Sequence, residues 1–189
     1  MARVRTFIAV ELNKAIQHRI ATLRDQLHST GTEIKWVEPD NLHLTLFFLG
    51  DVDERDIPSV CDAVDREVSK STSFEMSVER VGSFPNHYRP RVLWVGIVEG
   101  ARELSSLHER LEPCLLKLGC YRREDRKFTP HVTIGRIRSD HRQQGLAKEL
   151  AKYNSWQGGQ TSVQELLIMR SELTPRGPSY SVLGRARLQ

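Results

Sequence analysis

The sequence predicts a mixed α+β fold of two similar lobes, each with an antiparallel sheet that faces a central cleft and with helices on the outside. Three observations predict this fold. Strand-like apolar runs alternate with segments that repeat apolar residues at helical spacing, the order of these segments recurs once after 88 residues, and the two copies have nearly the same length. We expect one domain over residues 1–189, with lobes at about 1–85 and 90–175 and a C-terminal segment, 176–189, that closes onto the sheets.

The first half of the chain alternates between strand-like and helical patterns. After a strand-like run that includes VRTFIAVE, apolar residues recur at helical spacing at Ile16, Ile20, Leu23 and Leu27. A turn, EPDN, separates a short strand from the apolar run LHLTLFFL. We expect these elements, in chain order, at 3–11 (strand), 14–28 (helix), 34–37 (strand), 42–49 (strand), 55–68 (helix) and 74–81 (strand).

The second half repeats this order. Few side chains are identical between the halves, so the repeat rests on the order of the elements. The segment 82–91 (GSFPNHYRPR) is rich in turn formers, and we expect the crossover between the lobes there. A shift of 88 residues predicts a strand at 92–99, a helix at 101–118, a helix at 142–153 and a strand at 162–169.

The composition narrows the class of protein. A hydrophobic content of 39% and a charged content of 28% are typical of a soluble globular protein. No apolar run is long enough to span a membrane, and the N-terminal residues lack the pattern of a signal peptide. The three cysteines, odd in number and without a Cys-x-x-Cys pair, predict reduced thiols in a cytoplasmic protein and no zinc site. The net charge of +4 is compatible with a polyanionic ligand without requiring one.

Two His-x-Thr motifs lie within apolar strand-like runs, 88 residues apart. They read Leu-His43-Leu-Thr45-Leu and Pro-His131-Val-Thr133-Ile. In a strand, residues two apart point to the same face, so each motif presents an imidazole and a hydroxyl together. A pseudo-twofold axis would bring the two pairs to one cleft.

This arrangement favours acid–base chemistry on a phosphate. Histidine titrates near neutral pH, so one imidazole can act as general base while the other acts as general acid. The threonine hydroxyls suit the non-bridging oxygens of a phosphate. A metal site is less favoured because neither motif contains a carboxylate or a cysteine and threonine is a poor ligand, so we expect no metal and no cofactor. The residues alone leave open which histidine is the acid.

Several stretches resemble one known family. NLHLTLFFLG and TPHVTIGRI resemble the two HxTx motifs of the 2H phosphoesterase superfamily. RTFIAVEL, KWVEPDNLHLTLFFLGDV, VGSFPN, RPRVLWVGI and SELTPRGPSYSVL resemble its RNA 2′,3′-cyclic phosphodiesterases, also called 2′-5′ RNA ligases or the LigT/ThpR family. The resemblance spans essentially the whole chain. It implies a bilobal α+β fold, a metal-independent reaction, and RNA with a 2′,3′-cyclic phosphate terminus, or a related nucleotide, as partner.

The resemblance also assigns roles. It implies that His43 is the proton donor to the leaving ribose oxygen and that His131 is the proton acceptor that activates water. Thr45 and Thr133 would bind the phosphate oxygens. The implied reaction opens the cyclic phosphate to a 2′-phosphate end, and its reversal with a 5′-hydroxyl would give a 2′-5′ linkage.

Five further residues are candidates for substrate binding. Arg136 lies an odd number of residues after the second motif histidine, so it shares that face only if a bulge at the preceding residue shifts the alternation. Phe84 is a candidate for base stacking, although aromatic residues in strands more often belong to the core. Arg91 and Arg126 are candidates for an entry funnel. Tyr180 either closes the cleft or packs against its wall.

Two alternatives remain open. One is a non-catalytic protein that binds RNA ends, against which the matched acid and base count. The other keeps the enzyme but changes the substrate to a 2′-5′ oligoadenylate or a small cyclic nucleotide phosphate. The sequence indicates no membrane association and no obligatory protein partner.

Overall fold

The computed structural model describes residues 2–28, 32–123, 125–138, 144–175 and 177–189. The strands are β1 (Arg3–Glu11), β2 (Ile34–Trp36), β3 (His43–Asp53), β4 (Phe74–Phe84), β5 (Val92–Ile97), β6 (His131–Ile137), β7 (Gln157–Val163), β8 (Glu165–Thr174) and β9 (Gly177–Arg187). The helices are α1 (Lys14–His28), α2 (Ile57–Val68), α3 (Ala101–Lys117) and α4 (Gln144–Leu150), with short 3₁₀ turns η1 (Pro39–Asn41), η2 (Glu54–Asp56) and η3 (Ala151–Tyr153).

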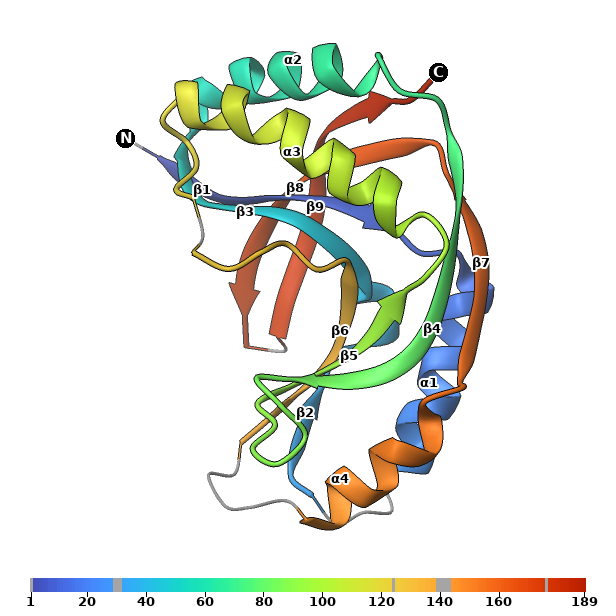
Figure 1. Ribbon diagram of the computed structural model, residues 1–189. Helices are drawn as coiled ribbons and strands as arrows, with labels where there is room; N and C mark the ends of the chain where they lie inside the picture. Colours follow the sequence, from blue (N-terminus) through green and yellow to red (C-terminus); the bar gives the residue numbers. More distant parts are fainter. Residues whose placement is uncertain (1, 29–31, 124, 139–143, 176) are drawn as a thin grey trace.

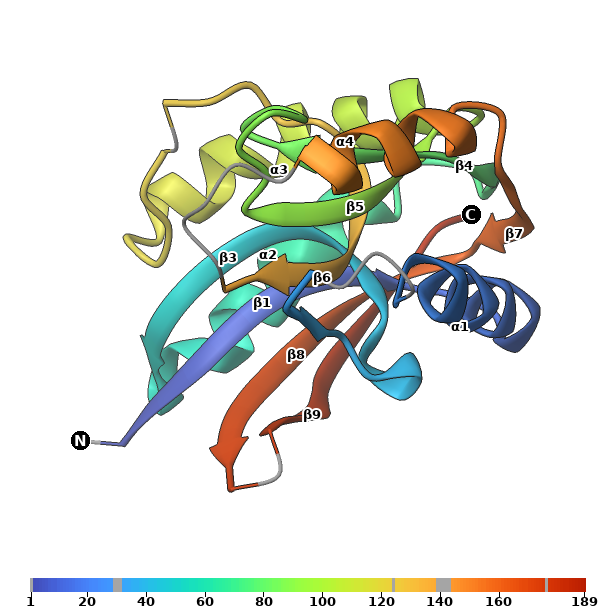
Figure 2. The same ribbon diagram turned by 90° about the horizontal axis from the view of Figure 1, so that it is seen from below.

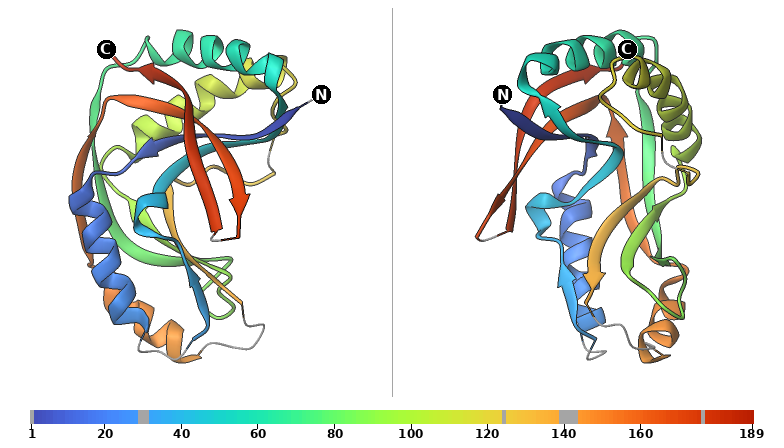
Figure 3. Two further views of the ribbon diagram at one scale, coloured as in Figure 1. Left: turned by 180° about the vertical axis from the view of Figure 1, so that it is seen from behind. Right: turned by 90° about the vertical axis from the view of Figure 1, so that its left-hand side faces the viewer.

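The strands form one curved antiparallel sheet with two equivalent halves (Figure 3). Its order is β7-β4-β5-β6-β3-β1-β8-β9, with β2 added on β6. The four strands β7, β4, β5 and β6 on one side of the junction correspond to β9, β8, β1 and β3 on the other. Between β6 and β3, a single register pair, Leu44 with Val132, joins the two halves. The fold is therefore the mixed α+β fold of two sheet-bearing lobes that the sequence predicts, with the two sheets joined at the centre.

The halves of the sheet do not follow the halves of the sequence. β4 pairs with β5 and β7, whereas β8 pairs with β1 and β9, so these two strands are exchanged between the repeats. The segment 82–91, predicted as the crossover between lobes, instead comprises the end of β4 and the turn to the neighbouring strand β5, and this prediction was wrong. The division of the sequence near residues 85–90 is consequently not a boundary within the sheet.

The helices cover the outer faces of the two halves (Figures 1 and 2). α2 and α3 pack together against the half that contains β3, β8 and β9, and α1 packs near β7 on the other half. α3 shows why: Leu104, Leu107, Leu111 and Leu115 recur three or four residues apart and are all buried. Burying such an apolar stripe against a sheet is what holds each layer in place.

Several element boundaries differ from the predicted ones. The strand expected at 42–49 continues to Asp53, past Gly50, whose positive φ of 71° suits a glycine. The strand expected at 162–169 is divided between β7 and β8, which turn at Gln164. The C-terminal segment forms β9, which pairs with β8 along its whole length. Residues 142 and 143, where we expect the last helix to begin, lie outside the described residues.

Candidate active site

The two His-x-Thr motifs lie side by side at the centre of the sheet. The register pair that joins β3 to β6 consists of Leu44 and Val132, the middle residues of the two motifs. Both of these side chains are fully buried. Since neighbouring residues of a strand point to opposite faces, the histidines and threonines on either side project away from the core.

This register brings all four motif side chains together. In an antiparallel pair centred on the motif midpoints, His43 is opposite Thr133 and Thr45 is opposite His131. Each imidazole therefore has a hydroxyl from the other half as its neighbour. The two histidines are diagonal neighbours, a relation that separates residues by about 7–8 Å in a regular ladder. All four side chains are half-buried, as expected for residues that line a cleft.

Each imidazole is oriented by a backbone carbonyl two residues before it. Nδ1 of His43 lies 2.7 Å from the carbonyl oxygen of Asn41, and Nδ1 of His131 lies 2.7 Å from that of Thr129. A carbonyl only accepts hydrogen bonds, so Nδ1–H donates in both cases. Nε2 of each ring is then left for chemistry, with a lone pair when the ring is neutral and a proton when it is charged.

Aromatic rings enclose His43. Phe7 stacks on its imidazole with ring centres 4.8 Å apart, and Tyr180 meets both rings edge-on at 5.3 Å and 5.0 Å. Burial lowers the pKa of His43 below its ordinary value, and the hydrogen bond to Asn41 opposes this shift. Burial raises the pKa of Tyr180, partly offset by the charges of two arginines, so its hydroxyl remains a donor at neutral pH.

His131 has a different enclosure. Phe84 lies edge-on to its imidazole at 5.0 Å, and Trp94 lies 6.4 Å away. Burial lowers the pKa of His131, the hydrogen bond to Thr129 opposes the shift, and the positive charge of Arg136 lowers the pKa further. A cation therefore disfavours the protonated form of this histidine, whereas burial is the only cause that lowers the pKa of its counterpart.

A bulge in β6 places Arg136 on the histidine face. The pairing of β6 with β5 shifts register at this point, and Ile134 and Gly135 are buried in succession. The alternation therefore resumes one residue late, and the Arg136 side chain is exposed on the same face as the motif. Its charge acts on both His131 and Tyr180, which lie in different halves of the sheet.

β3 contains the matching bulge and a residue that sequence reasoning missed. Leu46 and Phe47 are buried in succession, and Phe48, the counterpart of Arg136 at the offset of 88, follows with 58% of its surface exposed. Its ring lies 6.4 Å from that of Phe7. The offset of 88, applied to the predicted candidate Arg136, is the signal that would have identified Phe48.

A cavity of about 520 Å³ opens beside His43. Its walls come from β1, β8, β9 and the turn that precedes β3, and they include Phe7, Asn41, Met169 and Tyr180. The predicted candidate Tyr180 therefore lines this cavity beside His43. The cavity is large enough for a nucleotide-sized ligand.

The remaining predicted residues lie at different distances from the motifs. Phe84 contacts His131, as described above. Arg91 is exposed at the start of β5, where its backbone bonds to Phe84 and Ile137, close to the end of β6. Arg126 is exposed in the loop before β6, and within the described part of the chain no hydrogen bond or ion pair joins it to the four motif residues.

Two further observations concern metals and membranes. Among the described residues, no three His, Cys, Asp or Glu side chains gather in a way that could hold a metal ion. In the same part of the chain, no helix combines the length and apolar character needed to cross a membrane.

Known proteins of the same architecture identify the family. The family profile described as LigT like Phosphoesterase matches residues 10–94 and again residues 95–180, in agreement with the internal repeat. The chain is 35% identical to the RNA 2′,3′-cyclic phosphodiesterase of Methanothermobacter thermautotrophicus over 98% of its own length and 100% of that protein. It is also 35% identical to the protein of that name from Aquifex aeolicus, over 97% and 96% of the two chains.

Solved structures agree with the fold. The crystal structure of TT0787 of Thermus thermophilus superposes with a TM-score of 0.80 at 26% identity and covers 97% of both chains. Apo LigT of Escherichia coli superposes with a TM-score of 0.79 at 24% identity, over 100% of this chain and 99% of that one. The chain therefore belongs to the LigT-like phosphoesterases of the 2H superfamily.

Proposed function

We propose that this protein hydrolyses RNA 2′,3′-cyclic phosphate ends to 2′-phosphate ends, without a metal, by a two-histidine acid–base mechanism. The observation that carries this proposal is the register of β3 on β6, which sets two imidazoles and two hydroxyls around one point of the sheet. Relatives that cover the whole chain at 35% identity are named for this activity.

The proposed reaction needs one proton acceptor and one proton donor. Neutral His131 takes a proton from water through Nε2 while the water oxygen attacks phosphorus. The bond between phosphorus and the ribose 3′-oxygen breaks, and protonated His43 donates its Nε2 proton to that oxygen. The products are a 2′-phosphate and a 3′-hydroxyl, and the histidines exchange protons with solvent to restore the starting state.

The charge distribution supports this division of roles. Arg136 lowers the pKa of His131, which favours the neutral form that a base requires. No cation contributes to the shift of His43, which is the histidine that must carry the proton. The hydroxyls of Thr45 and Thr133 and the guanidinium of Arg136 are available to hold the non-bridging oxygens as negative charge develops on them.

The nucleoside is proposed to lie on the side of His43. Phe48 is exposed next to Phe7, which itself covers the His43 ring, so this half offers an aromatic surface on which a base can stack. With a 5′-hydroxyl in place of water, the same two histidines would run the reaction backwards and form a 2′-5′ linkage. All three cysteines are free thiols, which fits the cytoplasmic location that we propose.

Product analysis tests this proposal. A short RNA that ends in a 2′,3′-cyclic phosphate is incubated with the protein in EDTA, and its end group is identified. We expect a 2′-phosphate, with equal rates with and without the chelator, and unchanged rates in the variant His18→Ala, which alters an exposed histidine outside the site. A 3′-phosphate product contradicts the proposed leaving group. Tight binding of the RNA end without turnover favours the alternative of a non-catalytic RNA-end binding protein.

A further inference from the structure

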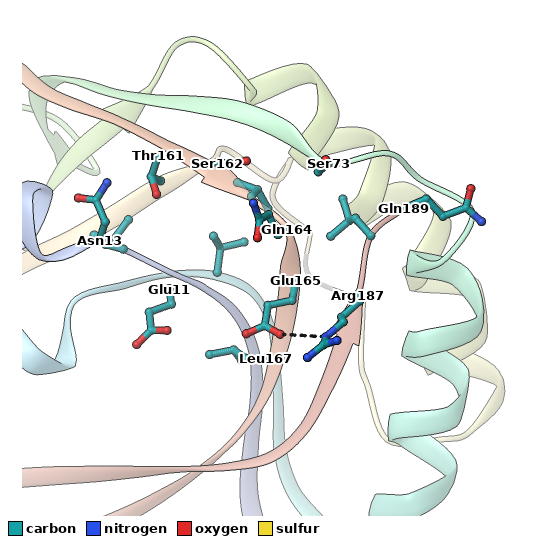
Figure 4. Close-up of a pocket in the computed structure, with 14 residues that line it drawn as sticks. Glu11, Asn13, Ser73, Thr161, Ser162, Gln164, Glu165, Leu167, Arg187 and Gln189 are labelled. Atoms are coloured by element: carbon teal, nitrogen blue, oxygen red, sulfur yellow. Dashed lines mark ion pairs between the residues drawn. The ribbon is translucent and has the colours of Figure 1, made fainter.

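A second cavity, of about 560 Å³, lies beside the candidate active site (Figure 4). It forms where the end of β1 and the adjoining ends of β7 and β8 meet β9, and we call it the β7–β8 pocket. Its lining includes Glu11, Asn13, Ser162, Gln164, Glu165 and Arg187. None of these residues has a part in the proposed acid–base reaction.

The β7–β8 pocket adjoins the cavity at His43. Glu11 and Leu167 line both cavities. Both cavities also lie on the same face of the sheet. On β8, Leu167 pairs with Ala9 and Met169 pairs with Phe7, the residue that stacks on His43. A ligand bound at the histidines can therefore extend into the pocket along one face of the sheet.

The neutral part of the lining presents hydrogen-bonding groups. Asn13 is held in place, since its Oδ1 accepts from the backbone N–H of Ile16 and its Nδ2 donates to the carbonyl of Gln160. The side chains of Ser162 and Gln164 are exposed at the pocket. Hydroxyl and amide groups of this kind match the edges of bases and the hydroxyls of ribose, in single strands whose bases are not paired.

The charged residues of the lining are Glu11, Glu165 and Arg187, and Arg185 lies next to them on β9. Arg185 forms an ion pair with Oε1 of Glu165, and Nε of Arg187 lies 4.0 Å from Oε2 of the same carboxylate. One carboxylate thus faces two guanidiniums, and the Arg187 side chain keeps 83% of its surface exposed. Figure 4 shows this pair on the opposite side of Leu167 from Glu11. A phosphate is therefore expected at Arg187, and ribose or base donors at the Glu11 carboxylate.

From this geometry we infer that the β7–β8 pocket is a subsite for the nucleotide on the 5′ side of the cyclic phosphate, with the connecting phosphate at Arg187 and the base or ribose at Gln164 and Ser162. The inference rests on the proposed function, since the histidine cleft must hold the cyclic end. It makes the enzyme selective for oligonucleotide ends over mononucleotides.

Kinetics on substrates of increasing length tests the subsite. The series is a nucleoside 2′,3′-cyclic monophosphate and RNAs of two and three nucleotides that end in the same cyclic nucleotide. We expect kcat/KM to rise from the mononucleotide to the dinucleotide. In Arg187→Ala and Gln164→Ala, kcat/KM for the oligonucleotides should fall about tenfold while the value for the mononucleotide stays within about twofold. Arg102→Ala, which removes an exposed arginine from α3, is the matched control and should change neither value.

Salt dependence and direct binding separate the possible outcomes. Loss of one phosphate contact should reduce the slope of log affinity against log salt by about 0.7 for a trinucleotide that ends in a 2′-phosphate, as measured by fluorescence anisotropy with Arg187→Ala. If cyclic ends of all lengths are cleaved equally, and the variants bind and cleave like wild type, the subsite is refuted while the proposed function stands. If nothing is cleaved but binding still depends on Arg187, the subsite stands and the proposed reaction fails.

Discussion

The two halves of the candidate site share the same arrangement of a histidine and a threonine and differ in the residues that surround it. Both have a histidine whose Nδ1 donates to the carbonyl two residues earlier, a threonine two residues later and a bulge after the motif. After the bulge, β3 exposes Phe48 whereas β6 exposes Arg136. In the proposed reaction, the shared features would transfer protons. The differing residues would orient the substrate, with an aromatic surface on one side and a cation on the other.

A second difference lies in the strands that flank the motifs. Ala9 pairs with Thr45, whereas the equivalent partner of Thr133 is Trp94. Trp94 packs so closely over Gly82 that a side chain there would overlap with its ring. Ala9 lines the cavity at His43, whereas on the other half the indole of Trp94 lies beside Thr133. Near-symmetry of the backbone is thus compatible with a substrate bound in one direction.

Removing either histidine should have the largest effect and tests what the halves share. We expect His43→Ala and His131→Ala each to lower kcat by about 10³-fold or more, at the upper end of the range for general acid–base catalysis. The double variant should lose little more than either single variant, because an acid and a base that act in one step are not additive. Single-turnover rates measure this. A single variant with wild-type turnover would contradict the account.

Removing Arg136 tests the phosphate side of the comparison. Arg136→Ala should lower kcat by about 10²-fold, because a cation aimed at developing negative charge stabilises the transition state. It should also raise the pKa of His131, since the arginine charge lowers that pKa. The low-pH limb of the rate profile then moves to higher pH, and Arg136→Lys should restore part of both effects. A change in KM alone would assign the arginine to ground-state binding.

Removing Phe48 tests the nucleoside side. Phe48→Ala should raise KM about tenfold with little change in kcat, as expected for the loss of one stacked base. Phe48→Tyr is the matched control and should behave like wild type. Because Phe48 is already exposed, the variant should keep its thermal midpoint. An unchanged KM would place the base elsewhere.

The shift of the pH optimum to the acid side of the ordinary histidine pKa should be the smallest of the expected effects. Burial lowers the pKa of both histidines from the ordinary value of 6.5. The base must be neutral, above its pKa, and the acid protonated, below its pKa. The window for kcat/KM therefore lies on the acid side of the ordinary value. Bound phosphate favours the charged imidazole, so the kcat profile should lie at higher pH than the kcat/KM profile. A kcat/KM optimum above pH 7 would contradict the burial of the pair.

Local sequence patterns were sufficient for the parts of the site that depend on strand alternation. His43, Thr45, His131 and Thr133 share a face because residues two apart in a strand do so, and the offset of 88 relates the two strands that bear them. The helices were predicted for a similar reason, since their apolar stripes appear directly in the spacing of residues such as Leu104 and Leu107 on α3.

Long-range pairing was not predictable in this way. The exchange of β4 and β8 between the repeats involves partners far apart in the sequence, and periodicity carries no information about which strand lies next to which. The register of the first strand also departs from the repeat. Glu11 pairs with His43 and Gly96 with His131, so the offset here is 85 instead of 88. Phe48 was missed because of the bulge in β3. An inserted residue breaks the alternation of faces on which the prediction depends.

The pH–rate profiles of the two histidine variants test the central claim most directly. With His131 as base and His43 as acid, His131→Ala should lose the low-pH limb of kcat/KM and keep the high-pH limb, and His43→Ala should do the reverse. Loss of opposite limbs by the two variants would establish a matched pair with divided roles. Loss of the same limb by both variants, or a complete bell in either, would contradict it.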